Sequence, residues 1–191
     1  MQFVRDFLGI FSSIAQDLHM YLLKDSSVHS KLQIFLTSPS FHGLMAYRFY
    51  SFFNRYRFYI LSWPMYFWAR IIFSMDIHPS AEIQPGVVID HGIGVVIGET
   101  ASVGTGSLIY HGVTLGAKNN CLGKRHPQVG NNVVIGAGAK ILGYVFVGND
   151  VKIGANSVVL RDIPSMVTAA GIPAEIKKNK AVYYAQKEVE K

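Results

Sequence analysis

Cysteines, long apolar runs and nucleic-acid-binding motifs are all scarce in this 191-residue sequence. The single cysteine, Cys121, cannot form an intrachain disulfide, so the fold does not need an oxidising compartment and we expect a cytoplasmic protein. The most apolar segment, residues 58–75, is interrupted by Pro64 and Arg70 before it reaches the roughly 20 apolar residues of a membrane span. We therefore expect no stable membrane insertion.

The net charge of +6 indicates anionic partners, but charge alone does not identify them. The basic residues are scattered, with one loose group between residues 48 and 70 and another between 177 and 180. Neither group lies in a recognisable nucleic-acid-binding motif. We therefore expect no nucleic-acid partner, whereas a phosphorylated small molecule would satisfy the charge.

The chain has two halves of different composition. Residues 1–74 are rich in aromatic residues and leucine, and apolar residues recur at helical spacing from Phe3 to Leu18, which predicts a small α-helical region. From Asp76 onward glycine and β-branched residues become frequent, as is typical of turns and short strands. We expect a second unit over residues 75–175 and a tail over 176–191.

An aliphatic residue recurs at intervals of six through the second half. A period of six fits neither a helix nor an alternating strand, but it fits a solenoid in which each hexad supplies one short strand and one turn. A β-sandwich, whose strands recur at roughly 8 to 12 residues, is the weaker alternative. At three hexads to a triangular coil, the pattern predicts about four coils. The positions are Ile77, Ile83, Ile89, Ile97, Val103, Ile109, Leu115, Val129, Ile135, Ile141, Val147, Ile153 and Val159.

The six-residue phase slips at two places, between Ile89 and Ile97 and between Leu115 and Val129. Each slip predicts that the chain leaves the regular coil there. The first slip carries Asp90 and His91, and the second contains a loop over residues 116–128. Loops of this length in a compact fold are commonly functional, so both slips are candidate sites.

A series of motifs runs in order over residues 76–174: DIHPSAEI, IDHGIGVVIGETASVG, GVTLGA, GKRHP, VVIGAGAKILG, VKIGANSVVLRDIP and AAGIPA. This series resembles the serine O-acetyltransferases, a family of hexapeptide-repeat transferases. The resemblance implies a left-handed parallel β-helix and assembly as a homotrimer or a dimer of trimers. It also implies transfer of acetyl from acetyl-CoA to the L-serine hydroxyl, with the helical region contributing to the substrate site and to oligomer contacts.

The resemblance assigns His91 as the general base and Asp76 as its partner. A serine hydroxyl is a poor nucleophile at neutral pH, and a neutral imidazole can remove its proton during attack on a thioester. A carboxylate on the other ring nitrogen fixes the tautomer and supports the developing positive charge. Asp76 precedes His91 by 15 residues, close to the length of one coil, although a capping role at the start of the solenoid stays open.

Serine is a zwitterion, so its site needs a cation for the carboxylate and acids for the ammonium. By resemblance, Arg125 and His126 bind the carboxylate, which an arginine can hold through two parallel hydrogen bonds. Asp90 and Asp25 are assigned to the ammonium. The family usually has Asp-Pro-Ala where this sequence has DSS, so a surface role for Asp25 stays open.

The residues expected to bind acetyl-CoA are mostly small. The backbone N–H groups at Gly116 and Ala117 are candidates to stabilise an oxyanion, although the family usually has a second glycine at the alanine. Ala137 and Ala155 leave room for the pantetheine arm, and Lys152 can meet a phosphate. Cys121 is expected to take no part, because direct transfer between bound substrates needs no covalent nucleophile.

Several alternatives remain open from the sequence. A sugar O-acetyltransferase would keep His91 and the CoA groove without needing Arg125. A non-catalytic trimeric scaffold would need none of these three features. A zinc site would require His91, His111 and His126 to converge, and we expect no metal. The tail lacks the terminal isoleucine by which some family members bind O-acetylserine sulfhydrylase, so we expect no such complex.

Overall fold

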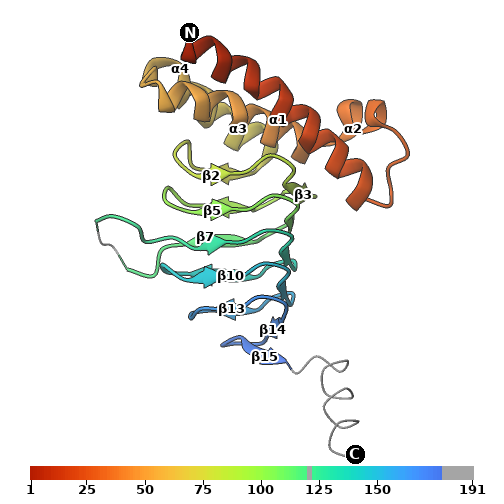
Figure 1. Ribbon diagram of the computed structural model, residues 1–191, viewed down its shortest axis with the longest axis vertical. Helices are drawn as coiled ribbons and strands as arrows, with labels where there is room; N and C mark the ends of the chain where they lie inside the picture. The colour runs from red at the N-terminus through yellow and green to blue at the C-terminus, as the bar shows by residue number, and fades with distance from the viewer. Residues whose placement is uncertain (120–121, 178–191) are drawn as a thin grey trace, which may run out of the picture.

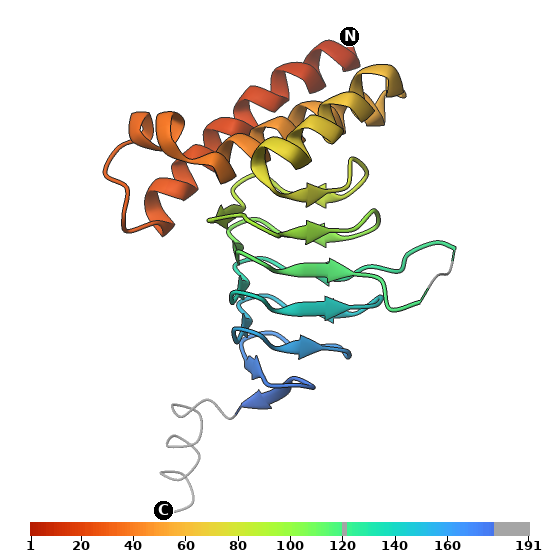
Figure 2. The ribbon, with the colours of Figure 1, turned by 180° about the vertical axis from the view of Figure 1, so that it is seen from behind.

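A computed structural model describes residues 1–119 and 122–177. Helices α1 (Gln2–Lys24), α2 (Lys31–Thr37), α3 (Pro39–Arg55) and α4 (Tyr59–Phe73) come first in the chain. They lie across one end of a solenoid of short parallel strands (Figure 1). The view from behind shows the same stack of coils below the helices (Figure 2). The predicted order, a small helical region followed by a parallel solenoid, is confirmed.

Serine side chains determine where two of the helices begin. Ser30 Oγ accepts a hydrogen bond from the backbone N–H of Gln33 at 3.1 Å, and Ser38 Oγ accepts one from the N–H of Phe41 at 3.3 Å. Helix α4 ends at Ser74, whose left-handed φ of 53° turns the chain into the solenoid. Within the described ranges, no helix is long and apolar enough to cross a membrane.

The strands stack on three faces of the solenoid, each named here after its first strand. The β1 face contains β1 (Asp76–Ile77), β4 (Val96–Ile97), β7 (Thr114–Gly116), β10 (Lys140–Leu142) and β13 (Val158–Val159). The β2 face contains β2 (Glu82–Ile83), β5 (Ser102–Val103), β8 (Gln128–Val129) and β11 (Phe146–Val147). The β3 face contains β3 (Val88–Asp90), β6 (Leu108–Tyr110), β9 (Val134–Ile135), β12 (Lys152–Ile153), β14 (Thr168–Ala170) and β15 (Glu175–Lys177).

The aliphatic positions of the hexads form the core of the solenoid. None of the thirteen is more than 5% exposed, and each pairs with its equivalent in the next coil, as Ile77 does with Ile97. Burying one such side chain stabilises the fold by about 1.5–3 kcal/mol, so the column supplies most of the driving force for stacking. The predicted inward orientation of these residues is confirmed.

The solenoid is one coil longer than the sequence pattern indicated, because its β1 face holds five strands. After Val159 the chain continues around the coil with a spacing that is no longer six. Ile163 bridges to Val147 and Ala169 pairs with Ile153, so both extend existing faces. The hexad count ended too early because the next inward residue comes only four positions after Val159.

The phase slips lengthen individual coils without disturbing the strand register. Ile77 pairs with Ile97, twenty residues further on, whereas Ile135 pairs with Ile153, eighteen residues further on. Val103 pairs with Val129, twenty-six residues further on, because this coil contains the loop. The extra residues therefore lie at the corners, where they project from the stack.

The last strand closes the β3 face in the opposite direction. Strand β15 runs antiparallel to β14, with Ile176 opposite Ala169. Residues 176 and 177, which the sequence assigned to a tail, therefore belong to a strand. Residues 178–191 lie outside the described residues, and so does the expectation about a sulfhydrylase complex, which depends on them.

A buried ion pair attaches the helices to the first coil. Arg48 on α3 contacts both carboxylate oxygens of Asp17 on α1 at 3.0 Å, and the two side chains are 8% and 1% exposed. The guanidinium also donates to the carbonyl oxygens of Ile83 and Gln84, and Asp17 Oδ1 accepts from the N–H of Gly86 at 2.7 Å. Burial raises the pKa of Asp17, and the charge of Arg48 opposes that rise.

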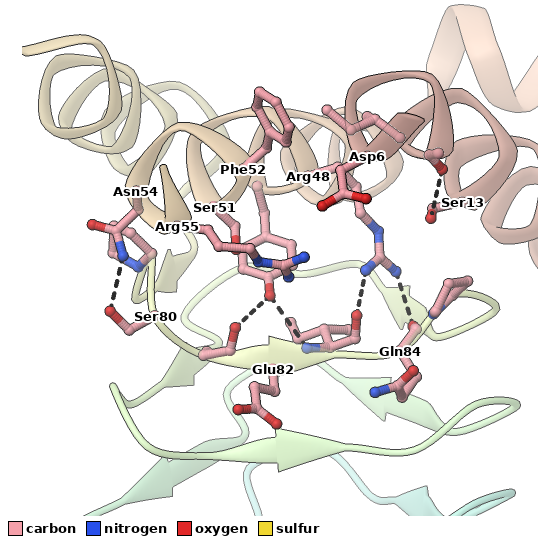
Figure 3. Close-up of a pocket in the computed structure, with 17 residues that line it drawn as sticks. Asp6, Ser13, Arg48, Ser51, Phe52, Asn54, Arg55, Ser80, Glu82 and Gln84 are labelled. Atoms are coloured by element: carbon pink, nitrogen blue, oxygen red, sulfur yellow. Dashed lines mark hydrogen bonds between the residues drawn. The ribbon is translucent and has the colours of Figure 1, made fainter. Parts of the chain in front are cut away.

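A cavity of about 670 Å³ lies between α1, α3 and the first coil (Figure 3). Tyr47 donates its hydroxyl to the carbonyl oxygen of Ala81 at 2.6 Å, and Asn54 donates to Ser80 Oγ at 3.0 Å. These bonds join α3 to the turn that follows β1. The cavity is lined by residues between 6 and 13, 47 and 55, and 79 and 85, so it contains none of the predicted site residues.

Removing Asp17 should destabilise the protein strongly. The Asp17→Ala variant leaves the buried Arg48 charge without a partner, which is expected to cost about 3–5 kcal/mol of unfolding free energy. Urea unfolding at one fixed protein concentration measures the loss. Asp150→Asn is the control, because Asp150 is an exposed acid at a left-handed φ of 57° that asparagine also adopts. A loss below about 1 kcal/mol in Asp17→Ala would contradict the anchoring role of the pair.

Candidate active site

The predicted site residues lie at two corners of the solenoid. At the first, which we call the His91 corner, the chain passes from the β3 face to the β1 face. At the second, the His126 corner, it passes from the β1 face to the β2 face. The turns of successive coils stack directly at each corner, so side chains from different coils form a column there.

Backbone hydrogen bonds hold the His91 corner together from coil to coil. Gly94 N–H donates to Ser74 O, Gly112 N–H to Ile93 O, Gly138 N–H to His111 O and Asn156 N–H to Ala137 O, at 2.8 to 2.9 Å. This ladder fixes the height of each turn at the spacing between adjacent strands, about 4.8 Å. It places the turn that carries His91 at the helical end of the column.

His91 occupies a backbone conformation that few residues other than glycine adopt. Its φ of 60° is left-handed, and other turns of the solenoid place Asn132, Asp150 and Asn156 in the same conformation. The imidazole is 70% exposed, its Nε2 lies 3.8 Å from Asp90 Oδ1, and its ring centroid lies 5.7 Å from that of His111. The left-handed turn therefore holds an exposed imidazole next to Asp90 and His111.

Asp76 lies close to this turn but is bonded elsewhere. Its Oδ1 accepts a hydrogen bond from the Tyr66 hydroxyl at 2.5 Å, and its Oδ2 lies 3.1 Å from Arg70 Nη2. Burial, together with the bond to Asp76, raises the pKa of Tyr66 to about 12, so the phenol remains a donor. The register pairs Asp76 with Val96, five residues after His91, because the spacing of fifteen residues falls short of this twenty-residue coil. In the described chain, no hydrogen bond joins Asp76 to His91.

Asp25 terminates α1 near the His91 corner. One helical turn earlier, Tyr21 donates its hydroxyl to Ile89 O at 2.9 Å, directly before Asp90. The Asp25 carboxylate accepts from the N–H and the hydroxyl of Ser27, at 2.8 and 2.6 Å. The helix thus ends one turn beyond its contact with Ile89, and a local turn holds the Asp25 carboxylate in place.

Three of the residues predicted to bind acetyl-CoA continue the same column. Ala137 and Ala155 lie in successive turns below His111, and Lys152 is an exposed residue of β12 just before the corner. The turns stack so closely that a Cβ on Gly136 would lie 2.6 Å from Ala155 N. Because the side chains in these turns are small, none of them projects far from the stacked backbone at this corner.

The His126 corner carries the other candidates. The Arg125 Nη2 atom lies 2.5 Å from Glu99 Oε2, and these side chains are 27% and 41% exposed. Gly116 ends β7 at the same corner and accepts a bond from Gly143 N–H at 2.9 Å, with Ala117 following. The loop that begins here projects from the side of the solenoid (Figure 1). Sequence analysis did not single out Glu99.

His126 is buried and fixed by Thr100. The Thr100 hydroxyl lies 2.9 Å from His126 Nδ1, and the Thr100 N–H donates to the same nitrogen at 3.2 Å. The ring lies over Gly98, where a Cβ would come within 2.1 Å of its Cδ2 and Nε2 atoms. Burial lowers the pKa of His126, and the neighbouring charge of Arg125 lowers it further.

A single chain does not bring the two corners together. The six residues from Gly94 to Glu99 cross the β1 face, a span of about 16 Å at roughly 3.3 Å per residue. His126 therefore does not converge with His91 and His111, and the described ranges contain no cluster of three His, Cys, Asp or Glu side chains suited to a metal. Cys121 lies outside the described residues.

Known proteins share both the repeats and the arrangement of the chain. Residues 126–161 match the family described as bacterial transferase hexapeptide (six repeats). The chain is 47% identical to serine acetyltransferase of Helicobacter pylori strain 26695 over 162 residues, which cover 85% of this chain and 95% of that protein. It is 40% identical to serine acetyltransferase of Staphylococcus aureus strain MSSA476 over 177 residues, covering 91% of this chain and 80% of the relative.

Solved structures agree with these sequence relationships. Neisseria gonorrhoeae serine acetyltransferase in complex with serine superimposes with a TM-score of 0.87 at 35% identity, covering 92% of this chain and 72% of that one. A serine acetyltransferase in complex with CoA gives a TM-score of 0.86 at 37% identity, covering 92% and 73%.

The hexapeptide solenoid, with an exposed imidazole above a column of small residues, defines an acyltransferase of the hexapeptide-repeat class. Within that class, the sequence identity to serine acetyltransferases and the share of the chain that it covers determine the family. The chain belongs to the serine acetyltransferase family.

Adding a side chain to Gly98 should dislodge His126. The new Cβ of Gly98→Ala would overlap the ring, so we expect a loss of about 1–3 kcal/mol in unfolding free energy from overpacking. Urea unfolding at fixed protein concentration measures it. Gly9→Ala is the control, because a Cβ there meets no atom within 4 Å and alanine favours a helix. Equal stability of Gly98→Ala and wild type would contradict the placement of the His126 ring.

Proposed function

We propose that this protein transfers the acetyl group of acetyl-CoA to the hydroxyl of L-serine, giving O-acetylserine and CoA. Membership of the serine acetyltransferase family supports this. The observation that carries the proposal is the exposed imidazole of His91, held in a left-handed turn beside Asp90 at the end of a column of small residues.

In the proposed reaction, His91 acts as the general base. Its neutral imidazole removes the serine hydroxyl proton while the oxygen attacks the thioester carbonyl carbon. The tetrahedral intermediate then expels the CoA sulfur as the C–S bond breaks, and the imidazolium returns its proton to the thiolate. No atom of the protein becomes acetylated, so the enzyme needs no nucleophilic side chain of its own.

Two carboxylates are available to support the imidazolium. Asp90 is the nearer in this structure, with its Oδ1 atom 3.8 Å from His91 Nε2. We propose Asp76 as the orienting partner, because residues 74–76 pack against the turn that carries His91. Met75 packs so closely against Gly92 that a Cβ added to this glycine would lie 2.6 Å from the Met75 sulfur. Tyr66 and Arg70 would then hold the Asp76 carboxylate in place.

Charged groups at the two corners match the two ends of serine. We propose that Arg125 and His126 bind the carboxylate, and that Asp90 and Asp25 bind the ammonium. The guanidinium of Arg125 has further N–H donors beyond the one directed at Glu99. Both acids lie on the His91 side, so serine would span the two corners with its hydroxyl at the imidazole.

We propose that acetyl-CoA lies along the His91 corner. Its pantetheine arm would pass the small residues Ala137 and Ala155, and its phosphates would meet Lys152. The backbone N–H groups near Gly116 and Ala117 are proposed to stabilise the oxyanion, and they lie on the His126 corner. The co-substrate would therefore also contact both corners.

This division leads us to propose that each site forms between two copies of the chain. The His91 corner of one subunit would face the His126 corner of the next, which three subunits around a threefold axis satisfy equally. A homotrimer, alone or paired into a dimer of trimers, is thus the proposed assembly. The helical region, residues 1–74, would contribute Asp25 to the site and contacts between subunits, with residues 75–175 as the catalytic unit. The single cysteine favours a cytoplasmic location.

Replacing His91 should abolish turnover while leaving the fold intact. The His91→Ala variant loses the general base, and we expect kcat to fall by about 10²–10⁴. Release of CoA from acetyl-CoA with L-serine measures the effect. His111→Ala removes the neighbouring imidazole of the same corner and should keep kcat within about tenfold of wild type. Serine-dependent turnover that survives His91→Ala would overturn the mechanism.

Mixed oligomers test whether two chains build each site. His91→Ala and Arg125→Ala subunits are each expected to be nearly inactive alone, because one lacks the base and the other the carboxylate ligand. In a random equal mixture, about one site in four pairs an intact His91 with an intact Arg125. Oligomers co-expressed from equal amounts of the two variants, purified without selection for composition, should therefore recover about a quarter of wild-type CoA release. Activity no higher than that of the separate variants would show that each site lies within one chain.

A further inference from the structure

We propose that Thr100 is a positioning residue that fixes His126 in the tautomer carrying its proton on Nε2. In this tautomer the ring presents an N–H donor to the bound carboxylate. The ligand in this inference is the serine of the proposed function, whereas the tautomer itself follows from the geometry of the His126 corner alone.

The hydrogen bonds around Thr100 determine which ring nitrogen is protonated. The Thr100 backbone N–H donates to His126 Nδ1 at 3.2 Å, and since an N–H can only donate, Nδ1 must be an acceptor. The Thr100 hydroxyl accepts from the N–H groups of Arg125 and His126, at 3.0 and 3.2 Å. Its own hydrogen then points to Nδ1, 2.9 Å away.

The remaining proton of the neutral ring is therefore on Nε2. A proton on Nδ1 would face the Thr100 N–H, and Thr100 Oγ, which already accepts two N–H bonds, has no lone pair left to accept a third. Burial disfavours the charged ring as well. Nε2 makes no hydrogen bond to any described residue, and no buried side-chain nitrogen or oxygen in the described chain lacks a partner. Nε2 must therefore lie on the accessible edge of the ring, over Gly98.

The tautomer matters because a carboxylate can only accept hydrogen bonds. A ring with its proton on Nδ1 would direct a lone pair at the serine carboxylate and repel it. A neutral alcohol such as a sugar hydroxyl can both donate and accept, so it would pair with either tautomer. Thr100 thus favours a substrate with a carboxylate at this position. Glu99 orients the guanidinium of Arg125 next to His126.

Kinetics of two Thr100 variants test the proposal. Thr100→Val keeps the shape but removes the hydroxyl, and we expect KM for serine to rise about tenfold or more. KM for acetyl-CoA should change less than about twofold, because in the described chain no hydrogen bond joins Thr100 to a residue proposed to bind acetyl-CoA. Thr100→Ser keeps the hydroxyl and should restore the serine KM. Equal serine KM values in the valine and serine variants, whether raised or unchanged, would overturn the positioning role.

Nitrogen NMR tests the tautomer without any turnover. In protein labelled with ¹⁵N-histidine, long-range ¹H–¹⁵N correlations distinguish Nε2–H from Nδ1–H rings, and His126→Asn identifies the His126 signals. We expect a neutral Nε2–H ring at pH 7.5 in wild type and in Thr100→Ser, and a mixture of tautomers in Thr100→Val. A wild-type ring that is charged or protonated on Nδ1 would overturn the proposal. If the expected tautomer is found but wild type does not acetylate serine, the proposed function fails and the positioning role stands.

Discussion

Register between successive coils is the constraint on which this structure depends. Every inward aliphatic side chain lies on its equivalent in the next coil, and the corners are joined by backbone hydrogen bonds. Because stacking leaves no freedom to slide, any extra residues must leave the coil at a corner. The two phase slips obey this rule, and each places unusual side chains outside the stack. The candidate site residues are thus the ones that the core cannot accommodate.

The same register exposes backbone polar groups at the first coil, and the helices satisfy them. Arg48, Tyr47 and Tyr50 each donate to carbonyl oxygens of that coil, and Tyr21 reaches Ile89. An open strand edge invites pairing with another chain, so covering it with helices protects the solenoid end. The helical region therefore closes the stack, and its buried charges are retained because they bond to backbone that apolar side chains could not satisfy.

The parts predictable from sequence were those with a strict period. The hexads predicted the inward residues and both departures from the coil, because each buried position must hold an apolar side chain at a fixed spacing. The partners of Asp76 were not predictable, since Tyr66 and Arg70 come from a helix whose docking leaves no periodic signal. Thr100 and His126 could have been paired in advance. Each lies three residues before an inward valine, and those valines are neighbours in the stack.

The ladder at the His91 corner gives the molecule a fixed unit of length. Each coil moves the column by about one interstrand spacing, 4.8 Å, and no side chain can change that increment. Residues that contact a ligand along this corner are therefore separated by whole multiples of the interstrand spacing. Evolution or design can lengthen the groove only by inserting a complete coil, which would move Lys152 away from His91 by one step while leaving the surroundings of both residues unaltered.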